Sequence, residues 1–92
     1  NAEATGEKYR DIAKAMGVKG VDEMTLEDAR NAACDAVARL SRDVGIPENL
    51  KGIVKEEDID FLSQSAMDDA CRPGNPKDPT KEDIIALYKS LL

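Results

Sequence analysis

The sequence contains no histidine and only three aromatic residues, which are Tyr9, Phe61 and Tyr88. Without histidine, these 92 residues cannot form a histidine-based catalytic triad or a histidine-ligated metal site. Few aromatic side chains are present on which nucleic-acid bases could stack. The net charge of −6 and the pI of about 4.6 indicate an acidic surface, which repels a phosphate backbone. We therefore expect no nucleic-acid partner.

Cysteines and long apolar runs are also scarce. Cys34 and Cys71 are too few for a disulfide-rich scaffold or for a zinc site, so we expect reduced thiols and a cytoplasmic location. No apolar run approaches the roughly 20 residues of a membrane span, and we expect no membrane partner. The first residue is Asn1 rather than methionine, which we interpret as a sign of processing or of a longer parent protein.

What the sequence does contain is helical periodicity. Four segments repeat apolar residues at helical spacing and none alternates with the period of a strand, so the sequence predicts an all-α fold. Thr25 with Asp28, and Thr80 with Asp83, resemble capping boxes at helix starts. We predict a single helical domain over residues 1–92 without a β-sheet. The predicted helices cover residues 6–16, 26–44, 55–71 and 81–91.

Each predicted helix has one apolar face that we expect to be buried. On the first helix the face contains Tyr9, Ile12, Ala13 and Met16. The second has the longest face, formed by Leu26, Ala29, Ala33, Val37, Leu40 and Val44. The third has Ile59, Leu62, Ala66 and Ala70, with Phe61 and Met67 beside them, and the fourth has Ile84, Leu87, Tyr88 and Leu91, with Ile85 beside them. These faces require more partners than four short helices supply, which predicts self-association.

The two cysteines receive different interpretations. We expect Cys34, beside the apolar face of the second helix, to be a small core residue. Cys71 lies at the predicted end of the third helix, where the negative end of the helix dipole disfavours the nucleophilic thiolate. The adjacent carboxylates Asp68 and Asp69 diverge on a helix and do not form a catalytic pair. From the residues alone we predict no catalytic, cofactor-binding or metal-binding side chain.

Four stretches carry a resemblance that covers essentially the whole chain in order. They are "GEKYRDIAKAMGV" (6–18), "LSRDVGIPENL" (40–50), "EEDIDFLSQSAMDDAC" (56–71) and "GNPKDPTKEDIIALYKSLL" (74–92). As a set they resemble the C-terminal end of iron-containing alcohol dehydrogenases, and within that family the lactaldehyde reductase (1,2-propanediol oxidoreductase) subgroup.

The resemblance implies a specific fold and division of labour. The chain would form the four-helix second half of the helical metal-binding domain in a dehydroquinate synthase-like fold. An upstream α/β domain would bind NAD(P), and upstream aspartate and histidine ligands would hold Fe(II) or another divalent metal. The chain's partner would then be this N-terminal part of the parent enzyme, with homo-oligomers also possible, and the 92 residues alone would be inactive.

The resemblance also implies a role for one residue. Cys71 matches a cysteine at the rim of the family's substrate cavity, so it would line the substrate pocket of the parent enzyme without acting as a nucleophile. The alternative is an autonomous helical interaction module without catalysis, which would use its exposed apolar faces to bind a partner.

Overall fold

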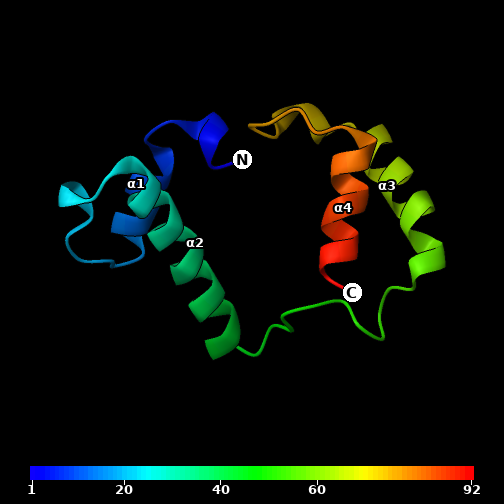
Figure 1. The fold of residues 1–92 in the computed structure, drawn as a ribbon, viewed down its shortest axis with the longest axis horizontal. Helices are drawn as coiled ribbons and strands as arrows, with labels where there is room; N and C mark the ends of the chain where they lie inside the picture. Colours follow the sequence, from blue (N-terminus) through cyan, green and yellow to red (C-terminus); the bar gives the residue numbers. More distant parts are fainter. The chain divides into compact units, whose positions relative to one another are not determined.

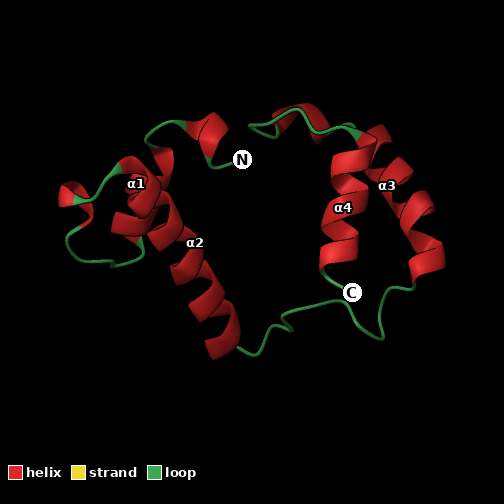
Figure 2. Ribbon diagram, in the orientation of Figure 1, coloured by secondary structure: helices red, strands yellow, loops and turns green.

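Helices are the only regular elements in the computed structural model, which describes all residues from Asn1 to Leu92. The α-helices are α1 (Lys8–Ala15), α2 (Leu26–Asp43), α3 (Ile59–Asp68) and α4 (Lys81–Ser90) (Figure 1). Short 3-10 turns occur at Glu3–Thr5, Val21–Glu23, Glu56–Asp58 and Arg72–Gly74. Figure 2 shows helices and loops alone. The predicted all-α class and its four helices are confirmed, and no helix is both long and apolar enough to span a membrane.

The chain divides into two compact units, Asn1–Ile46 and Pro47–Leu92. In the first unit α1 packs against α2, and in the second α3 packs against α4 (Figure 1). Within the second unit, the backbone N–H of Leu50 donates to the carbonyl of Leu91 at 2.8 Å, which ties the segment before α3 to the end of α4. The expectation of one domain over residues 1–92 stays a prediction.

Two helices begin at threonine residues, as their sequences indicate. The hydroxyl of Thr25 accepts the backbone N–H of Asp28 at 3.1 Å and caps α2. Thr80 caps α4 in the same way, and the Asp83 carboxylate accepts the N–H of Thr80 in return, completing a capping box. These contacts satisfy N–H groups that have no partner inside the helix.

Glycine closes α1 and α2. Gly17 and Gly45 follow the last turns with φ of +85° and +81°, a left-handed conformation that only glycine adopts at low cost. Their N–H groups donate to the carbonyls of Lys14 and Arg42, each at 3.1 Å, which uses carbonyls left free at the helix ends.

Alanine dominates the core of the first unit. Ala13 of α1 and Ala29 of α2 are fully buried, and Ala33 and Val21 are nearly so. Half-buried Tyr9, Val18 and Met24 pack around this cluster. Because alanine has the smallest apolar side chain, the two helices approach closely, but they bury little apolar area.

The rest of the expected apolar face on α2 is exposed. Val37, Leu40 and Val44 are exposed, with Val44 at 63% of its full accessibility. The predicted burial of this half of the face is wrong, because α1 has only eight residues and reaches only the first half of the longer α2. On α1, Ile12 and Met16 are likewise exposed rather than buried.

Cys34 is exposed, so its predicted place in the core is wrong. It directly follows buried Ala33, and consecutive residues on a helix point about 100° apart. The side that α1 covers is centred on Ala29 and Ala33, and Cys34 lies outside it.

The second unit has an even smaller core. Ile59 and Ser63 of α3 are its only fully enclosed residues, and the Ser63 hydroxyl has no hydrogen-bond partner. Leu62 and Ala66 are half-buried beside them. The prediction placed Ala70 in this face, whereas Ala70 is exposed because α3 ends at Asp68.

Several other large side chains of this unit are also uncovered. Phe61 is 73% exposed on α3, and Leu87 and Leu91 are exposed at α4, so the expected burial of the last two is wrong. Ile84, Ile85 and Tyr88 are half-buried. One helix partner can cover one side of α4 only, which leaves this surface open.

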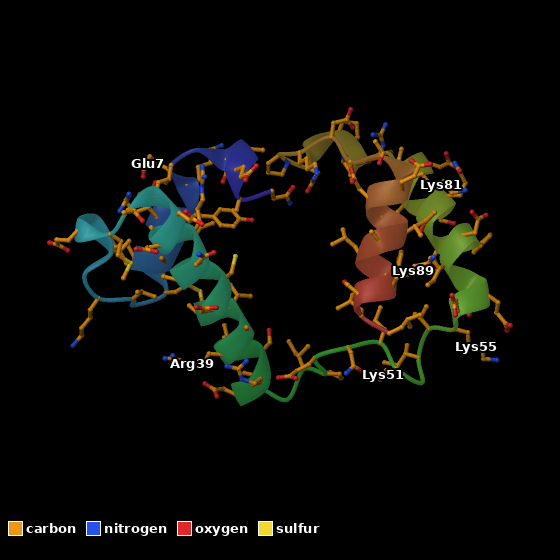
Figure 3. All side chains as sticks on the ribbon, viewed as in Figure 1. Glu7, Arg39, Lys51, Lys55, Lys81 and Lys89 are labelled. Atoms are coloured by element: carbon orange, nitrogen blue, oxygen red, sulfur yellow. The ribbon has the colours of Figure 1, made fainter.

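In the first unit, two arginine side chains on the helices donate hydrogen bonds to backbone carbonyls of the connecting segments. Arg10 donates to the carbonyls of Val21 and Met24 across the loop that follows α1, and its Nε lies 2.7 Å from Glu7, labelled in Figure 3. Arg30 of α2 donates to the carbonyl of Gly6 at 3.1 Å. These bonds satisfy loop carbonyls that neither helix can reach through its backbone.

The alanine contact makes a testable prediction. Ala33→Leu should lower the free energy of unfolding by about 1–3 kcal/mol, because the larger side chain cannot fit between α1 and α2 without moving them. The same substitution at exposed Ala38 should change it by no more than about 0.5 kcal/mol. Urea unfolding followed by circular dichroism measures both, and equal effects at the two positions would show that the close contact is absent.

Candidate functional site

Cys71, the one predicted site residue, lies in the connection between α3 and α4. We call residues 69–80 the Cys71 loop. The residue is exposed and its thiol is free. Its backbone N–H donates to the Asp69 carboxylate at 2.7 Å, and its carbonyl accepts the N–H of Gly74 at 3.0 Å. Cys71 therefore sits in a tight turn rather than in the last turn of α3, where the sequence placed it.

Asp69 explains why α3 ends three residues earlier than predicted. Its backbone is extended, with φ of −65° and ψ of 130°, and its side chain accepts the N–H of Cys71, which would otherwise continue the helix. Aspartate side chains commonly compete with helix hydrogen bonds in this way. Pro73 then supplies no N–H to continue an α-helix, and the chain makes only a short 3-10 turn at Arg72–Gly74.

Arg72 bonds to partners on both sides of the turn that carries Cys71. Its Nε donates to the carbonyl of Met67 in the last turn of α3 at 2.9 Å. Its Nη1 lies 2.7 Å from Oδ1 of Asp78, near the start of α4. Arg72, Pro73, Asn75 and Asp78 line a surface depression of about 270 Å³.

The sequence analysis did not predict the bonds that Arg72 makes to Met67 and Asp78. An arginine just beyond a helix end is a signal for bonds to the last carbonyls of that helix, and this signal was present. The partner Asp78 could not be chosen from sequence, since several carboxylates lie at similar separations.

The start of α4 closes the other side of the loop. The side-chain amide of Asn75 donates to the carbonyl of Lys77 at 2.6 Å. The Asp83 carboxylate accepts the N–H of Thr80 at 3.0 Å, and Lys77 lies 3.8 Å from it. The hydrogen bonds from Thr80, and then the charge of Lys77, hold the pKa of Asp83 below its ordinary value of 3.8.

A second depression lies in the first unit, between the segment that follows α1 and the exposed half of α2. It measures about 590 Å³ and brings together apolar and charged side chains. Arg39, labelled in Figure 3, borders it together with Met16, Lys19 and Leu40. No arrangement of a nucleophile with a base occurs there.

The chain's own residues do not fit a metal or a dinucleotide. No group of three or more histidine, cysteine, aspartate or glutamate side chains gathers where a metal ion could be held. No glycine-rich phosphate-binding fingerprint occurs in the sequence either. What the second unit offers instead is a short, internally bonded loop that presents one small thiol.

The model of the Fe-containing alcohol dehydrogenase family, C-terminal part, matches residues 1–92. The chain belongs to the Fe-containing alcohol dehydrogenase family.

Relatives of the chain are alcohol and aldehyde oxidoreductases. It is 60% identical to lactaldehyde reductase of Escherichia coli over 96% of its own length, which is 23% of that protein. It is 36% identical to 1,3-propanediol dehydrogenase of Citrobacter freundii, over 97% of the chain and 23% of that protein. It is 33% identical to the NAD-dependent methanol dehydrogenase of Bacillus methanolicus, over 100% of the chain and 24% of that protein. The chain thus spans about a quarter of the length of these relatives.

The lowered pKa of Asp83 leads to a prediction about pH. A carboxyl group whose pKa falls on folding adds stability above its unfolded pKa, and this stability is lost as pH falls through the folded value. At about pH 7, Asp83→Asn should therefore lower the free energy of unfolding, while the difference from the unchanged chain should shrink as pH falls through the folded pKa of Asp83. Urea unfolding across this range measures it. A difference that is independent of pH would contradict the electrostatic origin.

Proposed function

We propose that this chain forms the C-terminal helical segment of a metal-dependent, NAD(P)-linked alcohol dehydrogenase. The whole enzyme would interconvert short alcohols and aldehydes by hydride transfer. The 60% identity to a lactaldehyde reductase over 96% of the chain carries this proposal. The names of the other relatives, a 1,3-propanediol and a methanol dehydrogenase, also denote short alcohols, so a small hydroxyaldehyde such as lactaldehyde is the substrate we propose.

The proposal assigns the chemistry to other parts of the polypeptide. Fe(II) or another divalent metal would polarise the carbonyl oxygen and NAD(P)H would supply the hydride, with both groups held by upstream residues. The 92 residues would be inactive alone, since they present neither a metal-binding group nor a dinucleotide loop. We also propose a cytoplasmic location, supported by two free cysteines.

The exposed apolar side chains support a partner for this chain. Val37, Leu40 and Val44 continue the buried face of α2 beyond the end of α1. We propose that the rest of the enzyme covers them, because relatives of about four times this length contain enough further chain to do so. Alternatively, a second copy of the protein would cover these side chains in a homo-oligomer. An autonomous interaction module would show the same exposed side chains. It would have no reason, however, to match the C-terminal model of an enzyme family over all of residues 1–92.

Within the proposed enzyme, Cys71 would form part of the substrate pocket wall. The thiol is exposed, small and weakly polar, and the loop that carries it leaves the end of a helix, where binding groups are frequently placed. Hydride transfer needs no nucleophilic thiol, so its role would be to set the space available to the substrate.

This role predicts a change in substrate selection. In the complete enzyme, Cys71→Val should reduce kcat/KM for longer alcohols relative to shorter ones, and Cys71→Ala should increase it. Contact with about one methylene group is worth about 1–3 kcal/mol of binding in such pockets. This corresponds to a change of roughly 10- to 200-fold in the ratio of kcat/KM for longer and shorter alcohols. The measurement is kcat/KM for a series of alcohols of increasing chain length.

Cys34→Ala is the matched control, because Cys34 is also exposed but lies on α2. It should leave the chain-length profile unchanged. If both Cys71 variants keep the unmodified profile, Cys71 does not line the pocket.

A further inference from the structure

We propose that Arg72 is a positioning residue for substrate selection, because it fixes the loop that presents Cys71. This inference rests on the proposed function, in which Cys71 lines the substrate pocket. Arg72 would not touch the substrate. It would act by bonding the turn at residues 69–74 both to the end of α3 and to Asp78, which lies in the last part of the loop before α4.

The bonds around Cys71 divide into local and bridging ones. The local bonds join Asp69 to Cys71, Asp69 to Arg72 and Cys71 to Gly74, and they give the turn its shape. They cannot fix its direction, since all of them lie within residues 69–74. The two side-chain bonds of Arg72 reach Met67 and Asp78, outside the turn on either side. The N–H of Asp69 also donates to the carbonyl of Ala66 in α3, at 3.4 Å, but this bond holds only the first residue of the turn. The two side-chain bonds of Arg72 therefore resist rotation of the rest of the turn about the end of α3.

The geometry requires arginine rather than a general positive charge. A planar guanidinium carries donors along different edges, so Nε can bond the Met67 carbonyl while Nη1 bonds Asp78. A lysine ammonium at the end of a flexible stem can reach one partner but does not reproduce this fixed fork.

The two contacts of Arg72 differ in their exposure to water. The Arg72 side chain is 31% exposed, whereas the exposed fraction of Asp78 is 89%. Water and salt screen the ion pair with Asp78, so the bond to Met67 at the helix end should contribute more to fixing the loop. The pair Lys14–Asp22 of the first unit has both side chains more than half exposed, which is the ordinary situation for a surface pair.

The first experiment tests whether Arg72 fixes the loop, without reference to activity. Amide hydrogen exchange of the complete enzyme is measured for peptides that contain residues 69–76. Arg72→Gln should raise exchange at Cys71, Gly74 and Asn75 about tenfold, the effect of losing roughly one hydrogen bond to a charged group. Arg39→Gln is the matched control, since it removes the same charge from an exposed position on α2. Unchanged exchange in Arg72→Gln would overturn the proposal.

The second experiment tests whether the fixed loop selects substrate. Arg72→Gln should raise kcat/KM for longer alcohols relative to shorter ones, as Cys71→Ala does. Arg72→Lys should restore only part of the original preference for shorter alcohols. Asp78→Asn should give a smaller shift, because its bond is the more screened one. A double variant of Arg72→Gln and Asp78→Asn should shift the profile no more than Arg72→Gln alone, since both act through one contact.

The outcomes separate this inference from the function on which it rests. If Cys71→Ala changes the profile but Arg72→Gln does not, the pocket role stands and the positioning role of Arg72 is overturned. If neither changes the profile while exchange rises in Arg72→Gln, the pocket role of Cys71 fails, and the inference fails with it. Complete restoration by Arg72→Lys would also overturn it, because charge alone would then suffice.

Discussion

Contact through alanine between α1 and α2 limits how much apolar surface this chain can bury. Ala13, Ala29 and Ala33 let the helices approach closely, but each contributes only a methyl group to the core. The short α1 leaves the second half of α2 uncovered, so Val37, Leu40 and Val44 stay in water. The second unit is limited similarly, with Ile59 and Ser63 as its buried residues. We propose that the rest of an enzyme about four times longer, like the relatives of this chain, covers these surfaces.

With so little core, arginine bonds to backbone carbonyls fix the connections. Arg10 and Arg30 hold the segments around α1, and Arg72 holds the Cys71 loop. Arg10 and Arg30 bond carbonyls outside the α-helices, and Arg72 bonds the carbonyl of Met67 in the last turn of α3, which has no N–H partner within the helix. In the second unit this arrangement gives the loop a defined shape, although few apolar side chains pack beneath it.

Local signals predicted the helices, whereas long-range contacts could not be predicted. Thr25, Thr80, Gly17 and Gly45 act on groups within a few residues, so their capping roles follow directly from the sequence. The burial of α2 depended on the length of α1 and not on the periodicity of α2 itself, and for this reason Val37 and Leu40 were wrongly expected in the core. Cys34 was wrongly expected there because it lies beside the covered face of α2 and not on it. Arg30 bonds the carbonyl of Gly6, 24 residues away, and no spacing rule indicates such a partner. For the candidate site, the sequence placed Cys71 beside a helix end but missed the side chain of Asp69, which ends α3 early.

The most direct test of this account concerns the uncovered face of α2. Leu40→Cys would be introduced together with Cys34→Ala and Cys71→Ala, both in the 92-residue chain and in the complete enzyme. The rate of thiol labelling at position 40 would be followed by peptide mass spectrometry at low protein concentration. The account predicts rapid labelling in the 92-residue chain, where Leu40 is 51% exposed, and strong protection in the complete enzyme. Equally rapid labelling in both would contradict the claim that the rest of the enzyme covers this face.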